Sequence, residues 1–194
     1  MNTKEALRCS NEARTLTKIA AAQTNSRLAQ PQFEAAIAVF RELGNRNGEM
    51  AVLANLGTLH RREHRLAAAL QSYDQAIALT KETNNPRALA TSRHLRGTVL
   101  KEQGDLDAAR RSFEASLATF RQMEMKSSMP IVLIALAELA ALRGDFAQAQ
   151  KLAREAEAMQ PPGEKVQTRA CAGHSPALPS RRGTSRKLKS SPMR

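Results

Sequence analysis

Small and aromatic residues recur along this chain at intervals of forty. Each copy has an alanine followed four places later by an aromatic residue: Ala29 and Phe33, Ala69 and Tyr73, Ala109 and Phe113. In the best preserved copy, from Gly97 to Leu117, two short amphipathic helices are predicted on either side of a tight turn at Gly104-Asp105. Residues four apart share a helical face, and a fixed period indicates a repeat architecture, so the pattern predicts a stack of similar helix pairs.

Turn and stop signals divide the chain between these helices. A first helix is predicted over residues 3–22. A second helix, with Pro31 in its first turn, is predicted to reach about Leu43, because proline loses no hydrogen bond there. Residues that favour turns, or that precede proline, then mark the later boundaries at His64-Arg65, Asn84 to Pro86, Gly104-Asp105, Ser127 to Pro130 and Gly144-Asp145. The last helix is predicted to stop before Pro161-Pro162-Gly163.

The repeated positions resemble the tetratricopeptide motif, Trp-x2-Leu-Gly-x2-Tyr on a first helix, then Ala-x3-Phe and a closing proline on a second. The first-helix copies are Leu53-x2-Leu56-Gly57-x2-His60, Gly97-x2-Leu100 and Leu133-x2-Leu136-Ala137-x2-Ala140. In the middle copy Arg93 and Arg96 replace two apolar residues. The resemblance covers residues 1–160 and is clearest from 49 to 160.

A period of forty is longer than the usual 34 of tetratricopeptide repeats. This spacing resembles the long-helix variant in kinesin light chains and in the sensor arms of bacterial signalling ATPases and transcription regulators. HEAT-like pairs, with a period of roughly 40–47, are the rival interpretation. The repeated Gly-Asp turn and the Ala-x3-aromatic pattern argue against them.

The predicted fold class is all-α, an α-solenoid of three to four antiparallel helix pairs in a tetratricopeptide-like right-handed superhelix. We expect a degenerate helix pair over residues 1–48, three repeats over 49–160 and a basic, low-complexity, disordered tail over 161–194. Hydrophobic residues make up 42% of the chain but aromatic residues only 3%. Alanine and leucine therefore fill most apolar positions, which suits closely packed helices.

The net charge of +12 is concentrated in the predicted tail, which has eight Lys and Arg residues and one acid, Glu164. Such a tail could contact nucleic acid or anionic membrane while the repeats mediate assembly, which is the alternative function. Arg181-Arg182-Gly183-Thr184 also fits a basophilic kinase pattern. A solvated end without function, or a composition shift caused by a frameshift or mispredicted gene end, is equally consistent with the sequence.

The sequence predicts a cytoplasmic protein without cofactor or transmembrane segment. Cys9 and Cys171 are far apart and form no CxxC pair, which favours a reducing compartment. The N-terminal residues lack the apolar run of a signal peptide. The longest apolar run, from Ile131 to Leu142, contains Glu138 and is shorter than the ~20 residues that a membrane span needs.

No catalytic motif stands out. The stretch from His60 to His64 matches the H-x-x-E-H spacing of some zinc peptidases, but His60 occupies the repeat's aromatic position and His64 lies in a predicted turn. We therefore predict no metal site and no enzymatic activity. All aromatic residues fall at repeat positions, so none is left to stack on bases, and specific nucleic-acid binding is not expected.

The first helix of each pair is expected to line the concave face of the array. Residues at i, i+4 and i+7 share one helical face, which selects Ala54, Thr58, Arg61, His94, Thr98, Lys101, Ile134, Glu138 and Ala141. This face would carry a basic stripe beside an apolar end. Its cations could equally be solvated surface charges. Chaperone-tail-binding relatives use Lys and Asn where Ala54 and Thr58 stand, so that activity is not implied.

We predict a non-catalytic scaffold or adaptor that binds a peptide or partner helix along this face. The resemblance suggests a part of a signalling or transcription regulator. The partner should carry acidic and apolar residues. Repeat arrays need polar capping ends, and no further helix is predicted after Met159. Self-association through the array ends is therefore also expected.

Overall fold

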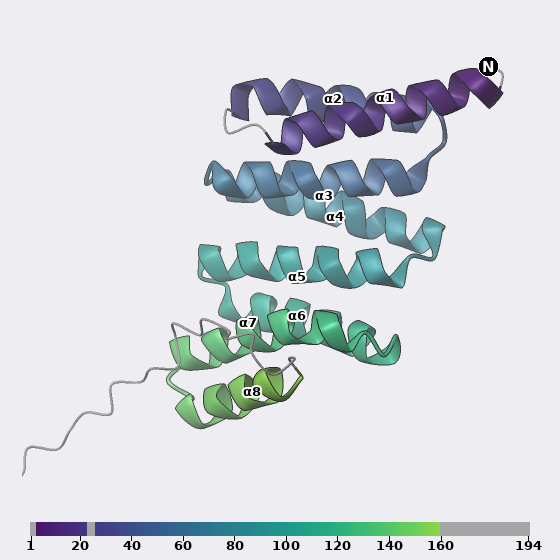
Figure 1. The fold of residues 1–194 in the computed structure, drawn as a ribbon. Helices are drawn as coiled ribbons and strands as arrows, with labels where there is room; N and C mark the ends of the chain where they lie inside the picture. Colours follow the sequence, from purple (N-terminus) through teal and green to yellow (C-terminus); the bar gives the residue numbers. More distant parts are fainter. Residues whose placement is uncertain (1–2, 23–25, 160–194) are drawn as a thin grey trace, which may run out of the picture.

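The computed structural model describes residues 3–22 and 26–159, and within these ranges eight α-helices form four consecutive pairs (Figure 1). The pairs are α1 (Thr3–Ala22) with α2 (Ser26–Glu42), α3 (Arg46–Arg62) with α4 (Leu66–Thr83), α5 (Pro86–Gln103) with α6 (Leu106–Gln122), and α7 (Met129–Leu142) with α8 (Phe146–Ala158). A short 3-10 helix, η1 (Lys126–Ser128), precedes α7. The described residues contain no strand, so the all-α prediction is confirmed.

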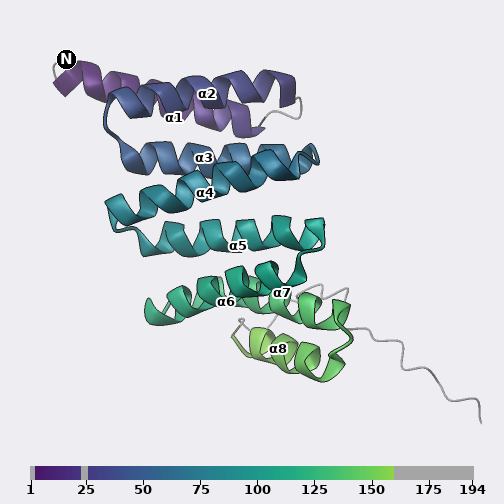
Figure 2. The same cartoon turned by 180° about the vertical axis from the view of Figure 1, so that it is seen from behind.

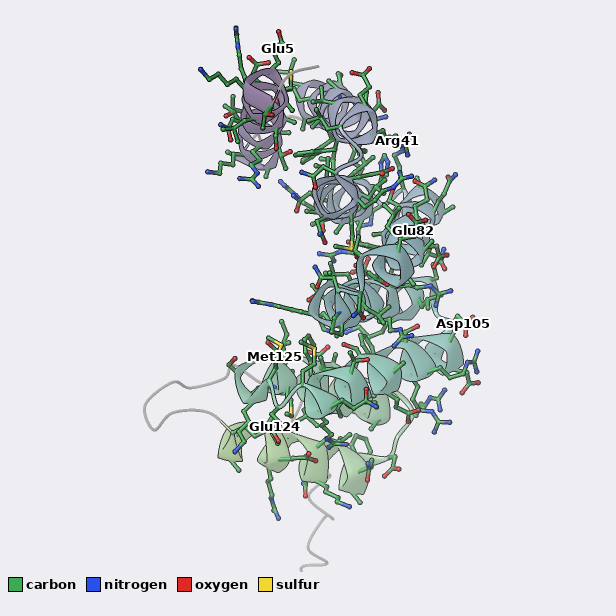
Figure 3. The ribbon with its side chains drawn as sticks, turned by 90° about the vertical axis from the view of Figure 1, so that its right-hand side faces the viewer. Glu5, Arg41, Glu82, Asp105, Glu124 and Met125 are labelled. Carbon is green, nitrogen blue, oxygen red and sulfur yellow. The ribbon has the colours of Figure 1, made fainter. Side chains whose placement is uncertain are left out.

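The two helices of each pair pack on each other, and the second helices α2, α4 and α6 also pack on the first helix of the next pair, which makes the stack a solenoid. Seen from behind, α2 and α4 lie in front of α1 and α3 (Figure 2). Viewed from the side, the stack bends into an arc (Figure 3). Arg41 and Glu82, on the second helices α2 and α4, lie on the outer side of this arc, and the first helices form the inner side. None of the described helices has both the length and the apolar character needed to cross a bilayer.

The turns repeat every forty residues, as the helices do. Within pairs, a residue in the left-handed region ends the first helix: His64 (φ 57°), Gly104 (φ 87°) and Gly144 (φ 80°). Between pairs the same conformation recurs at Gly44 (φ 62°), Asn84 (φ 46°) and Glu124 (φ 53°). Four of the helices that follow begin with an Asn or Asp cap, such as Asp105, whose carboxylate accepts a hydrogen bond from the Ala108 N–H at 3.0 Å.

The core of each central pair is an aromatic ring seated on a glycine. Tyr73 and Phe113 are fully buried, and each lies over the glycine of the preceding helix. A Cβ built on Gly57 would lie 2.8 Å from Cε1 of Tyr73, and one on Gly97 would lie 2.7 Å from Cε1 of Phe113. These separations are shorter than real contacts allow. Glycine is therefore required at both positions by close approach rather than by backbone conformation.

Three details of the sequence prediction were wrong. Pro31 lies in the second turn of α2 and not in the first, because the helix already begins at Ser26. Phe146 is 63% exposed, although its position suggested packing within the array. The boundary at residue 49 falls inside α3, which begins at Arg46. The tail over 161–194, and its predicted disorder, lies outside the described residues.

We expect Gly97→Ala to destabilise the protein by about 1–3 kcal/mol, because the added methyl group overpacks against the Phe113 ring. Denaturant unfolding would measure the loss. A second variant, Gly97→Ala with Phe113→Ala, reproduces the pair that Ala137 and Ala153 form in the last repeat. In the Phe113→Ala background the cost of the added methyl should vanish. An equal cost in both backgrounds would contradict the clash.

Candidate partner-binding face

The inner face of the arc is built from one side of each first helix (Figure 3). On α3 and α5 the predicted residues Ala54, Thr58 and Thr98 are half-buried. The Thr58 hydroxyl shares a 3.0 Å hydrogen bond with the Tyr73 hydroxyl, and both threonine hydroxyls donate to the carbonyl four residues earlier. These residues therefore form the floor of the face, and their polar atoms already have partners within the fold.

Acidic residues of the following repeat neutralise the predicted basic stripe. Arg61 Nη1 lies 2.7 Å from Glu102 Oε1, and Lys101 Nζ lies 2.6 Å from Glu138 Oε2. All four side chains are partly shielded from solvent. The pairs join α3 to α5 and α5 to α7, so they link consecutive repeats across the inner face. The sequence identified both cations and Glu138, but neither pairing.

His94 contributes to packing beneath this face. Its ring centroid lies 5.5 Å from that of Phe113 in a tilted arrangement. Burial lowers the pKa of His94 below 6.5, and the nearby Lys101 ammonium lowers it further. The neutral imidazole is therefore the form that the fold favours, and His94 adds no positive charge to the face near neutral pH.

Two basic residues on α1 extend the face and were missed by the sequence prediction. Arg14 and Lys18 lie forty residues before Ala54 and Thr58, so the period itself could have found them. Both are exposed, and neither forms an ion pair with any described side chain. At the other end of the array, Ile134 on α7 is half-buried and apolar. The face thus changes from basic at α1, through ion pairs on α3 and α5, to apolar at α7.

The two histidines of the H-x-x-E-H match do not share a helical face. His60 is buried, with 6% of its surface exposed, whereas α3 ends at Arg62 and His64 adopts the left-handed turn conformation. A metal site of this kind needs both side chains on one continuous helix. Throughout residues 3–22 and 26–159, no three His, Cys, Asp or Glu side chains are grouped so that they could hold a metal ion.

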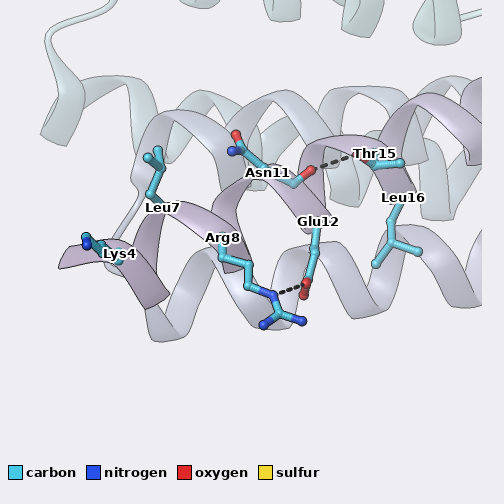
Figure 4. Close-up of a pocket in the computed structure, with 7 residues that line it drawn as sticks. All are labelled: Lys4, Leu7, Arg8, Asn11, Glu12, Thr15 and Leu16. Atoms are coloured by element: carbon cyan, nitrogen blue, oxygen red, sulfur yellow. Dashed lines mark hydrogen bonds and ion pairs between the residues drawn. The ribbon is translucent and has the colours of Figure 1, made fainter. Parts of the chain in front are cut away.

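A hollow of about 720 Å³ lies along α1 at the end of the array (Figure 4). Across it Arg8 Nε lies 3.1 Å from Glu12 Oε1. In the next repeat, forty residues later, Gly48 stands at the position of Arg8 and packs against Phe40. Val52 stands at the position of Glu12 and is buried in the core shared by α2 and α3. An ion pair on α1 therefore stands where the later repeat makes an apolar contact, beside the exposed Leu7.

Four helix pairs with a forty-residue period, three of which have the alanine-aromatic seam, define a tetratricopeptide-type helical repeat protein, as the sequence predicted. More particularly, the chain belongs to the family described as the MalT-like TPR region, which matches residues 3–174. No curated protein sequence matches this chain.

Solved structures share the fold at low sequence identity. Aspartyl phosphate phosphatase F from Bacillus subtilis superposes with a TM-score of 0.73 at 12% identity, covering 77% of this chain and 40% of that one. Apo RapI gives 0.71 at 15% identity, covering 78% and 43%. A putative kinesin light chain from Podosopora anserina gives 0.57 at 16% identity, covering 83% and 81%. This chain thus spans less than half the length of the first two proteins.

We expect the free energy of unfolding to fall as the pH decreases below about 6.5. Burial lowers the pKa of His60 and His94 in the folded protein, so the unfolded chain takes up protons that the folded chain resists. Arg65 strengthens this effect at His60, whereas Glu63 and Glu34 oppose it. Denaturant unfolding at pH 7.5, 6.5 and 5.5 would measure the loss.

Two variants test whether these histidines are responsible. A double variant, His60→Leu with His94→Ile, copies Leu100 and Ile134, which stand forty places later. It should make the free energy of unfolding less dependent on pH. His64→Asn is the control, because His64 is exposed and asparagine tolerates its left-handed conformation. A profile that keeps its slope in the double variant would contradict this assignment.

Proposed function

We propose that this chain is a non-catalytic adaptor whose inner face binds a peptide or partner helix. The observation that carries the proposal is the change of character along this face. Its α1 end has the cations Arg14 and Lys18, which form no ion pair within the described residues, and its α7 end has the apolar Ile134. Tetratricopeptide-type repeats as a family generally bind protein partners. The identity of the partner and a role within a signalling or transcription regulator remain proposals.

The same observation supports one orientation of the bound partner along the inner face. Arg61 and Lys101 already have carboxylate partners, so an incoming acid at the centre would compete with Glu102 and Glu138. Arg14 and Lys18 have no such competitor among the described side chains. We therefore propose that the acidic part of the partner lies on α1 and its apolar part on α7. Partners with acidic and apolar residues at opposite ends should bind best.

Peptide selection on the full chain would test this proposal. From a display library of helical peptides, we expect sequences that are acidic at one end and apolar at the other. Reversing two charges with Arg14→Glu and Lys18→Glu should weaken a selected peptide at least tenfold, because attraction becomes repulsion. The affinity, measured by fluorescence anisotropy, should become insensitive to these variants when the peptide's acidic residues are removed.

A matched control changes two exposed cations on the last helix, Lys151→Glu and Arg154→Glu. These alter the net charge equally but lie on a second helix, away from the inner face. Peptide affinity should stay within about twofold of the original. Equal weakening by both pairs of substitutions would show that only overall charge matters, and failure to select any peptide would also count against the proposed face.

The stated activity of a similar structure does not transfer to this chain. Aspartyl phosphate phosphatase F shares 12% identity and is much longer, so the similarity concerns the fold. Among the buried hydroxyls, Ser72 and Thr80 donate to carbonyls of their own helix, and Ser116 donates to the Ala90 carbonyl at 2.7 Å. We therefore propose a binding role without catalysis. A cytoplasmic location stays a prediction.

Self-association through the array ends also remains a prediction, and we propose the α8 end as its site. Leu142 and Phe146 are 64% and 63% exposed beside the last turn, where no described helix follows. Leu106, the counterpart of Phe146, packs against the core that extends into the next pair. Sedimentation velocity at increasing concentration should reveal dimers, and Leu142→Gln with Phe146→Ser should remove them. Leu7→Gln on the opposite end is the control; a monomer at all concentrations would refute the prediction.

A further inference from the structure

A cavity of about 400 Å³ lies on the outer side of the array, between the second helices α4 and α6. Its floor is the side of α5 that faces away from the inner surface. The residues that define its chemistry are Asp74 on α4, Arg93 and Arg96 on α5, and Arg111 and Ser112 on α6. This cavity, which we call the arginine notch, is separate from the proposed partner-binding face.

The arginines of this notch stand at positions that are apolar in neighbouring repeats. Arg93 corresponds to Leu53 and Leu133, and Arg96 to Leu56 and Leu136, all four of which are buried. The equivalent cavity forty residues later, between α6 and α8, is lined by Leu136 and also by Leu152, the counterpart of Ser112. The two notches therefore have the same architecture but different chemistry.

The two α5 arginines of this notch are each held by a polar partner. Arg96 Nε lies 2.7 Å from Asp74 Oδ1, and its Nη1 lies 3.0 Å from the Ser112 hydroxyl. Arg93 Nη1 donates to the Thr119 hydroxyl at 3.3 Å. Thr119 stands where other repeats have Leu79 and Met159. The arginines on α5 thus occur together with hydroxyl residues on α6, and these hydrogen bonds orient the two guanidinium groups.

The residues that line this notch carry a net positive charge. Outside the lining, the Asp107 carboxylate interacts electrostatically with Arg111, although its ion pair is with Arg143. Three arginines face one aspartate, which leaves a formal charge of +2. Neither Arg93 nor Arg111 forms an ion pair within the described residues. In the α6–α8 notch, Glu155 pairs with Arg121 at 2.6 Å, whereas its counterpart in the arginine notch is Ala115. At the position of Glu155, the arginine notch therefore has the small, uncharged Ala115, which adds no negative charge and leaves space in the cavity.

We propose that the arginine notch binds a phosphate group. A phosphate monoester carries roughly −1.5 to −2 at pH 7, which matches the uncompensated charge. Guanidinium groups donate pairs of parallel hydrogen bonds to phosphate oxygens, so Arg93 and Arg111 supply the donors, and the oriented Arg96 adds a third positive charge. A carboxylate would neutralise only half of the excess. The group could belong to a phosphorylated side chain or to a small free phosphate compound.

Titration of the full chain with inorganic phosphate, at constant ionic strength set with chloride, tests this site. The arginine Nε–Hε signals of Arg93 and Arg111 in NMR spectra should shift and saturate. Arg93→Gln with Arg111→Gln should weaken binding at least tenfold. Arg121→Gln in the neighbouring notch is the matched control and should change the affinity less than twofold. A phosphoserine peptide and its unphosphorylated form distinguish a protein-borne phosphate from a free one.

A second variant keeps the result interpretable if glutamine disturbs the fold. Arg93→Leu with Arg96→Leu restores the residues of the neighbouring repeats, so this protein should fold and should lose phosphate binding. In the original chain phosphate should also raise the unfolding temperature, and this rise should be absent from the leucine variant. Equal phosphate affinity in the original and leucine chains, or no shift beyond that caused by chloride, would overturn the proposal.

Discussion

Two aromatic rings, Tyr73 and Phe113, lie directly over the glycines of their partner helices, and the close approach of the central helix pairs depends on this contact. The space above Gly57 and Gly97 is filled by the ring itself, so no larger residue fits without displacement. Protein interiors are packed as densely as organic crystals, and each such contact therefore sets the distance between two helices. The alanines at Ala69 and Ala109, both fully buried, preserve the same spacing one turn away.

Once the pairs are held at this distance, the stacking of repeats determines which charges meet. Arg61 reaches Glu102 and Lys101 reaches Glu138, each across a repeat boundary. Partly exposed pairs of this kind contribute only about 1 kcal/mol or less each to stability. Their larger consequence is for recognition, since they occupy the charges at the centre of the inner face. The cations of this face that form no ion pair with a described side chain, Arg14 and Lys18, lie on α1 instead.

The outer side of the array shows a different consequence of the same repeat. Two positions that are leucine in neighbouring repeats are occupied here by Arg93 and Arg96. Both side chains extend into the space between α4 and α6. From the sequence, these two arginines were recognisable only as replacements of apolar residues. The structure shows that hydroxyl and carboxylate partners hold both groups, so the arginines line a polar cavity without entering the core.

The sequence alone determined the helix pairs, their turns and the alanine-aromatic seam. These features depend on local physics: helical periodicity, the left-handed preference of Gly104 and Gly144, and the capping side chain of Asp105. Only the tertiary structure decided which side chains of different helices meet. The pairing of Lys101 with Glu138 and the burial of His94 against Phe113 follow from how helices stack, which periodicity does not specify.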